Sequence, residues 1–81
     1  MKKYDERNLN ELLKVFDVGE RLSARQALDR LIDRRILTGG SMNYIPHVNR
    51  LAVTMKVSGR FIATQAVIDG AGDRTLYERA F

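Results

Sequence analysis

RLAVTMKVSGRFIATQAVI, residues 50–68, is the stretch that decides the predicted fold. Residues 50–58 alternate strictly between two sets of side chains, which is the period of a half-buried strand. Residues 60–68 are rich in aromatic and β-branched side chains, which favour a second strand. Ser58 and Gly59 suit a two-residue turn between them. The stretch therefore predicts an antiparallel hairpin that turns at Ser58–Gly59.

A helical interpretation of the same stretch stays open. It can be placed on a helix-turn-helix template, with helices over residues 48–56 and 60–68 and Val57 at the turn. Lys56 then stands where the template usually has glycine, and Gln65 occupies a position that should be buried. These two departures favour the strands, and an all-α helix-turn-helix fold remains the alternative.

A first helix is predicted from Asn8 onward. Apolar side chains recur there at three- and four-residue spacing, at Leu9, Leu12, Leu13 and Phe16. Asn8 suits the N-cap, with Glu11 as its capping-box partner, and Gly19 suits the C-cap. Residues 1–7 are polar, and we expect them to be frayed.

A second helix is predicted between Ser23 and Gly39. Ser23 suits the N-cap with Gln26 as its capping-box partner, and Gly39–Gly40 ends the helix. Four apolar residues share one arc of this helix: Ala27, Leu28, Leu31 and Ile32. Arg35 falls inside the apolar arc near its end, where we expect its stem to pack and its charged head to reach water. Residues 74–81 could form a third strand or a short closing helix.

Size and composition indicate one small domain over residues 1–81. The chain has 81 residues and no cysteine, which excludes disulfides and thiolate metal sites. It contains no apolar run of the ~18 residues that a membrane span needs, and we expect a cytoplasmic protein with no membrane partner. Because so small a domain buries little surface, a second subunit would stabilise it.

The charge distribution points to an anionic partner. The net charge is +4, and no acidic residue occurs between Asp33 and Asp69. The same interval carries five cationic side chains, at Arg34, Arg35, Arg50, Lys56 and Arg60. A segment of one sign within a small fold is the electrostatic pattern expected of a phosphate-facing surface.

Catalytic and metal-binding patterns are not evident in the sequence. His47 is the single histidine and follows Pro46 in an expected loop, without a partner at metal-ligand spacing. Asp69 and Asp73 bracket a glycine-rich turn that lacks the further ligands of a calcium loop. We therefore expect no enzymatic activity, no cofactor, no metal and no small-molecule ligand.

Residues 25–37, RQALDRLIDRRIL, resemble the recognition helix of bacterial winged-helix regulators of the GntR type. In that family a run of the form R-x-A-L-x-x-L and a later apolar pair lead into the wing. The matching residues are Arg25, Ala27, Leu28, Leu31, Ile36 and Leu37. Arg35 stands where the family has a glycine. The resemblance implies that Arg25, Gln26 and Arg30 face the major groove, with a β-hairpin wing near the backbone.

These observations favour an α+β, winged-helix-like domain in which two N-terminal helices precede an antiparallel hairpin or meander. We expect it to bind duplex DNA as a transcriptional regulator or accessory factor, and as a homodimer, because two half-sites add specificity. The expected contacts are Arg25, Gln26, Arg30, Arg34, Arg35, Arg50, Lys56 and Arg60.

Two other functions compete with DNA binding. Asp29 and Asp33 can pair with arginines at three- and four-residue spacing, which would make the second helix an ordinary solvated face. The protein would then be a protein-binding inhibitor or adaptor module. A binder of RNA or single-stranded DNA would instead stack bases on Phe61 beside Arg60.

Overall fold

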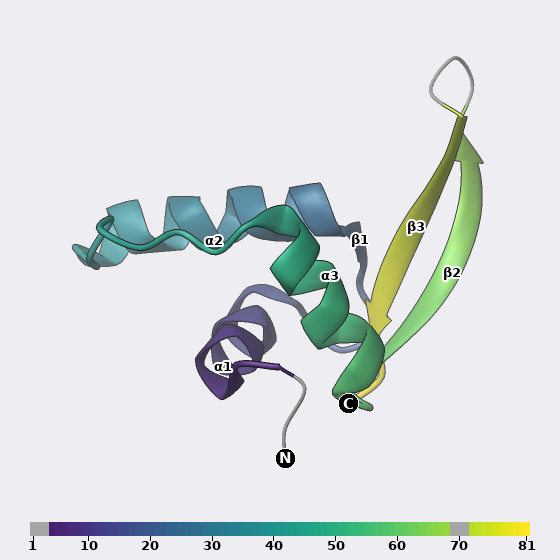
Figure 1. The fold of residues 1–81 in the computed structure, drawn as a ribbon, viewed down its shortest axis with the longest axis horizontal. Coiled ribbons are helices and arrows are strands. Elements are labelled where there is room, and N and C mark those ends of the chain that lie inside the picture. Colours follow the sequence, from purple (N-terminus) through teal and green to yellow (C-terminus); the bar gives the residue numbers. More distant parts are fainter. Residues whose placement is uncertain (1–3, 69–71) are drawn as a thin grey trace.

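The computed structural model describes residues 4–68 and 72–81, which form three helices and a three-stranded antiparallel sheet. The elements in chain order are α1 (Glu6–Val15), β1 (Arg21–Ser23), α2 (Ala24–Thr38), α3 (Val48–Val57), β2 (Phe61–Ile68) and β3 (Gly72–Arg79). The predicted α+β class is confirmed. The helices lie together on one side of the molecule, and the β2–β3 hairpin projects beyond them (Figure 1).

The sheet has the order β1-β3-β2, so the shortest strand pairs with the last one in the chain. In β1, Arg21 lies opposite Glu78, and the guanidinium Nε of Arg21 donates to the Glu78 carboxylate at 2.8 Å. β2 pairs with β3 along its whole length, from Phe61 opposite Arg79 to Ile68 opposite Gly72. The predicted strand over residues 60–68 is confirmed as β2, and residues 74–81 take the strand alternative. Residues 69–71 of the predicted turn lie outside the described residues.

The strand predicted over residues 50–58 is wrong, because this segment is the helix α3. Its buried residues are Leu51, Thr54 and Met55, which follow a helical rather than an alternating spacing. Val53 and Val57, which an alternating pattern would bury, are each 45% exposed. The hydroxyl of Thr54 donates to the backbone oxygen of Arg50 at 2.9 Å, so this polar residue is satisfied within the core.

The helix-turn-helix alternative is also wrong, since residues 61–68 form a strand and not a second helix. The predicted hairpin turn at Ser58–Gly59 is also wrong, because these residues connect a helix, α3, to the strand β2. Gly59 has a φ of 77°, a backbone conformation that favours glycine. The hairpin of the structure is therefore β2–β3, one strand later in the chain than predicted.

The limits of α1 differ from the prediction at both ends. Asp5, rather than Asn8, is the N-cap, and its carboxylate accepts from the backbone N–H of Arg7 at 2.9 Å. Glu6 and Arg7, expected to be frayed, are helical. The helix ends at Val15, and Gly19 lies in the turn before β1 instead of at the C-cap.

The limits of α2 are those that the sequence predicts. Ser23 and Gln26 form the capping box, with the Gln26 side chain accepting from the Ser23 backbone N–H at 2.9 Å. Gly39 is the left-handed C-cap, with a φ of 71°. Local capping interactions thus set both ends of the longest helix.

The core lies where the three helices meet the end of the sheet that contains Leu22, Phe61 and Tyr77. The rings of Phe16 and Phe61 pack edge to face, with their centroids 4.9 Å apart. Other buried apolar residues surround this pair: Leu12, Leu22, Ala27, Leu28, Leu31, Leu51, Met55 and Tyr77. Each helix and strand therefore contributes at least one residue to this core.

Candidate nucleic-acid interface

The side chains at the start of α2 have partners within the protein. Gln26 is held in the capping box, and Arg25 lies 3.5 Å from the carboxylate of Asp29. Arg30 donates to Glu20 at 2.6 Å and to the backbone oxygen of Val15 at 3.2 Å. Arg25, Gln26 and Arg30 are the residues that the resemblance places in the major groove.

The Arg30–Glu20 pair joins α2 to the segment that precedes β1. A hydrogen bond from the Arg30 guanidinium, followed by one from the backbone N–H of Asp17, lowers the pKa of Glu20. The same hydrogen bond to Glu20 raises the pKa of Arg30. Both groups are therefore charged at neutral pH, so the ion pair adds no net charge to this part of the surface.

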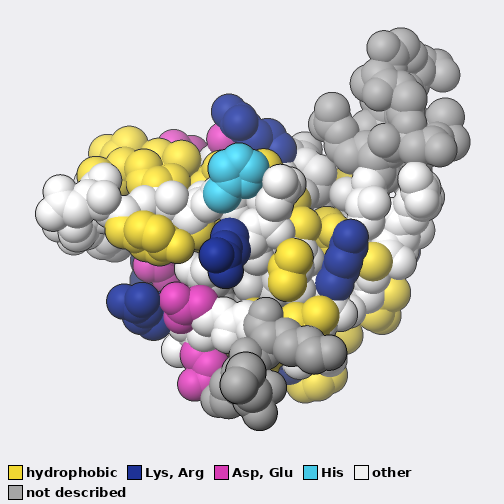
Figure 2. Space-filling view, viewed as in Figure 1, with side chains coloured by type: hydrophobic (Ala, Val, Ile, Leu, Met, Phe, Trp, Pro, Cys, Tyr) yellow, Lys and Arg dark blue, Asp and Glu magenta, His cyan; other side chains and the backbone are white. Residues whose placement is uncertain are grey.

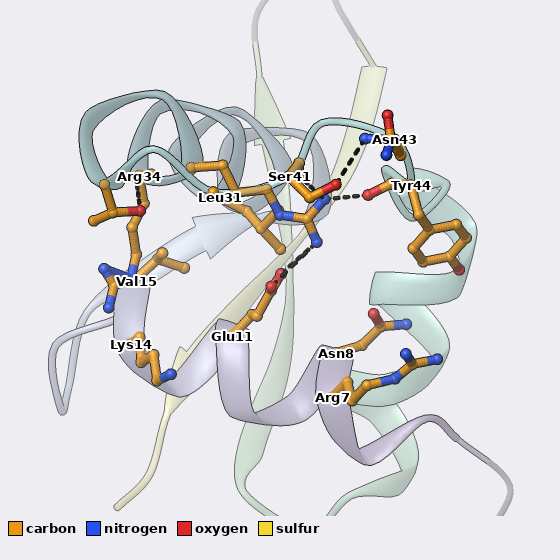
Figure 3. Close-up of a pocket in the computed structure, with 13 residues that line it drawn as sticks. Arg7, Asn8, Glu11, Lys14, Val15, Leu31, Arg34, Ser41, Asn43 and Tyr44 are labelled. Atoms are coloured by element: carbon orange, nitrogen blue, oxygen red, sulfur yellow. Dashed lines mark hydrogen bonds and ion pairs between the residues drawn. The ribbon is translucent and has the colours of Figure 1, made fainter.

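The expectation that the guanidinium of Arg35 reaches water is wrong. Its side chain is only 15% exposed, and Nη2 donates to both carboxylate oxygens of Glu11, at 3.1 and 2.9 Å. Nη1 donates to the backbone oxygen of Tyr44 and, at 3.5 Å, to that of Ser41 (Figure 3). The guanidinium thus links α2 to α1 and to the segment that leads to α3. It is not directed outward, toward a bound nucleic acid.

A cavity of about 380 Å³ surrounds this ion pair, between α1, α2 and residues 40–44. Lys14 and Arg34 line the same end of it (Figure 3). Neither side chain has a hydrogen bond or ion pair to the described part of the chain. Arg34 is therefore one predicted contact residue that keeps its charge available.

Replacing Arg35 with alanine should loosen the connection between α2 and α3. The variant leaves the Glu11 carboxylate and two backbone carbonyls without their donor, which should cost about 1–3 kcal/mol because the site is partly exposed. Thermal unfolding should show the loss, and amide hydrogen exchange should rise across residues 40–45. Lys14→Ala is the matched control, because it removes a cation from the same cavity that has no partner among the described residues. Equal stability of the two variants would contradict the role of Arg35.

The two residues proposed for base stacking are held within the protein. The Arg60 guanidinium lies 4.6 Å from the centroid of the Phe81 ring and donates to the backbone oxygen of Phe81 at 2.9 Å. Phe61 is buried against Phe16. Phe61 is therefore unable to stack on a base without leaving the core.

The outward surface of α3 carries cations without partners. Five exposed side chains fall on one arc of about 120° at the helical angle of 100° per residue. They are Lys56, Asn49, Val53, Val57 and Arg50, in order across the arc. No hydrogen bond or ion pair from the side chain of Arg50 or Lys56 to the described residues occurs. We call these five residues the α3 face.

The surroundings of the α3 face are almost free of acid. Over α3, Figure 2 shows basic, histidine and hydrophobic side chains, and none of the acidic side chains visible in this view lies among them. His47 caps the helix, its Nδ1 accepting from the Asn49 backbone N–H at 3.1 Å. Asp5 lies at one edge, across a groove that it lines together with Arg50. Hydrogen bonds from Arg7 lower the pKa of Asp5 most, and the charge of Arg50 contributes least.

The eight predicted contact residues do not form one surface. Arg50 and Lys56 share the α3 face, whereas Arg34 lines the cavity between α1 and α2. The other five have partners within the protein: Arg25, Gln26, Arg30, Arg35 and Arg60. Sequence reasoning missed Asn49, Val53 and Val57, because the strand interpretation placed both valines in the core. A helical interpretation of the acid-free interval would have found them.

Comparison with known proteins gives no relative. No protein-family model, no curated protein and no solved structure matches the chain. Within residues 4–68 and 72–81, no helix combines the length and apolar character needed to cross a membrane.

Proposed function

We propose that the protein binds duplex DNA through the α3 face. The observation that carries this proposal is the contrast between two helices. The arginines at the start of α2 pair with Asp29 and Glu20, whereas Arg50 and Lys56 lie on an arc of α3 that carries no acidic residue and form no hydrogen bond or ion pair with the described residues. Asp5, across the groove from Arg50, is hydrogen-bonded to Arg7. Only the second arrangement leaves charge for phosphates, whose neutralisation supplies most non-specific affinity for DNA.

The chemistry of the α3 face suits the major groove. An α-helix fits this groove, where an amide such as Asn49 can form paired hydrogen bonds with adenine. Arginine pairs in the same way with guanine, and apolar side chains contact the thymine methyl group. Arg50, Val53 and Val57 supply these two kinds of group on one arc.

The order of elements supports a winged-helix arrangement. A helix, a short strand, two helices and a hairpin follow one another, and the short strand pairs with the last strand. In helix-turn-helix proteins the second helix of the motif enters the major groove. By this analogy α3 is the reading helix and the β2–β3 hairpin is the wing. The GntR-type resemblance of residues 25–37 stays a prediction, and it would instead make α2 the reading helix.

The hairpin suits a supporting contact. Ala63, Thr64 and Gln65 of β2 are exposed and are small or polar. The β2–β3 hairpin to which they belong projects beyond the helices (Figure 1). Threonine and glutamine side chains are common donors to phosphate oxygens. A protein that binds DNA in this way acts by occlusion or recruitment, as a transcriptional regulator or accessory factor does.

Salt dependence of binding tests the proposal. Fluorescence anisotropy with a random-sequence duplex should show an affinity that falls linearly on a log–log plot with salt, by about 0.9 for each phosphate neutralised. If Arg50 and Lys56 each neutralise one phosphate, the affinity should fall about tenfold between ~50 and ~200 mM salt. Competition with single-stranded DNA and RNA belongs to the same experiment, and stronger binding to either would favour the single-strand alternative. Folded protein that binds no duplex at the lower salt would contradict DNA binding.

A protein-binding adaptor is the second candidate function. The paired arginines of α2 and a group of exposed apolar side chains at its far end both favour it. This candidate needs no charge on the α3 face. It would gain support if the protein bound neither duplex nor single strand.

A further inference from the structure

The far end of α2 carries a hydrophobic surface that no described part of the chain covers. Leu37 is 86% exposed and Ile36 64% exposed, the highest values among the large apolar residues of the helices. Met42 and Ile45, on the segment that runs back along α2, are 42% and 41% exposed. We call these four residues the α2 patch. Hydrophobic side chains gather over the same end of α2 in Figure 2.

The α2 patch is not a frayed end. Gly39 caps the helix, and the Gly40 backbone N–H donates to the backbone oxygen of Arg35 at 2.8 Å. Arg35 in turn fastens the segment that carries Met42 and Ile45 to α1 and α2. The backbone that carries these exposed apolar side chains is therefore held by hydrogen bonds, and exposed apolar side chains that lie together are typical of a binding surface.

Two opposite charges beside the patch have no partner in the described part of the chain. They are the carboxylate of Asp33 and the guanidinium of Arg34, which are adjacent in sequence and exposed on α2. Nearby carboxylates behave differently, since Glu11, Glu20 and Asp29 each pair with an arginine. Asp33 thus offers an acceptor on the exposed side of α2, and Arg34, one residue further along, offers a donor that also lines the cavity between α1 and α2.

A two-fold axis near these residues satisfies both charges at once. Two antiparallel α2 helices would bring Asp33 of each copy toward Arg34 of the other, because a two-fold contact is self-complementary. The same contact would bury Ile36 and Leu37 of both copies. We propose that the α2 patch is the interface of a homodimer, with a second copy of this chain as its partner.

The dimer goes beyond the proposed DNA binding and does not depend on it. The residues of the α2 patch are distinct from those of the α3 face, so the two contacts use different side chains. Two copies related by a two-fold axis would present two reading helices to a palindromic site. An 81-residue chain also gains from the apolar area that a second copy covers.

Sedimentation equilibrium of the parent protein without DNA tests the association. The parent should be a dimer at micromolar concentration, and Leu37→Glu should weaken the dimer by about tenfold or more, since a charge then replaces buried apolar surface. Val18→Glu is the matched control, because Val18 is 63% exposed in the turn before β1, outside the patch. Circular dichroism should show that both variants fold.

Exchange of the two charges identifies the partner as a second copy in this geometry. Asp33→Arg or Arg34→Asp alone should weaken the dimer, because like charges then face each other across the axis. The double variant Asp33→Arg/Arg34→Asp should restore it. A monomeric parent at high micromolar concentration, or a dimer that Leu37→Glu leaves intact, would overturn the proposal. Because DNA is absent, either failure is distinct from a failure of DNA binding.

Discussion

Replacing Phe16 with alanine should lower the free energy of unfolding by about 3–5 kcal/mol. Phe16 is buried, its ring packs edge to face on Phe61, and its backbone oxygen accepts from the Arg79 guanidinium at 2.8 Å. Loss of a core phenylalanine costs about 3–5 kcal/mol, because the remaining cavity collapses only in part. A domain of 81 residues has a total stability of only about 4–12 kcal/mol. The one substitution therefore removes a large share of the stability.

Urea and thermal unfolding followed by circular dichroism measure this effect. For a domain of this size, each kcal/mol shifts Tm by roughly 4–8 °C, so the midpoint should fall by more than about ten degrees. Phe81→Ala is the matched control, since Phe81 is 61% exposed and its ring contacts the Arg60 guanidinium. It should change the stability by about 1 kcal/mol at most. Equal losses from both phenylalanines would mean that the core does not centre on Phe16.

Local signals in the sequence predicted those parts of the fold that depend on local interactions. The limits of α2 follow from Ser23, Gln26 and Gly39, whose caps involve only neighbouring residues. β2 follows from a run of β-branched and aromatic side chains. The strand β1 was not predicted, because three residues show no period and its pairing partner lies at the other end of the chain.

The segment that forms α3 shows why the spacing of apolar residues alone predicted a strand in place of a helix. Leu51 and Met55 fit either a strand or a helix, since they are four residues apart. Val53 and Val57 completed an alternating pattern and so favoured a strand. Thr54, which is buried together with Leu51 and Met55, fits the spacing of a helix. A threonine whose hydroxyl bonds within its own helix behaves as a core residue, which composition cannot reveal.

The same error explains why the sequence did not predict the α3 face. Once the segment is a helix, Arg50 and Lys56 lie on one arc with Asn49 between them. The pairing of Arg30 with Glu20 and of Arg35 with Glu11 joins residues 10 and 24 positions apart. Such pairs depend on tertiary structure, so the sequence predicted the right charge but could not show which arginines would be neutralised.

Removing both cations of the α3 face should have the largest effect on DNA binding. The double variant Arg50→Ala/Lys56→Ala should reduce the log–log salt slope by about 2 if both side chains bind phosphates. If Arg50 instead pairs with a base, its removal should cost about 1–3 kcal/mol of binding free energy. Stability should change by no more than about 0.5 kcal/mol, because neither side chain has a hydrogen bond or ion pair to the described residues.

The control for this variant is Arg25→Ala/Arg30→Ala, which removes the same net charge from α2. Because Asp29 and Glu20 already neutralise these arginines, duplex binding should stay within a few-fold of the parent protein. Anisotropy titrations at two salt concentrations, with circular dichroism to confirm folding, separate the two helices. If the α2 variant loses binding and the α3 variant does not, α2 is the reading helix, as the resemblance of residues 25–37 implies. If both variants bind as the parent does, neither helix reads DNA, and the adaptor becomes the better explanation of this fold.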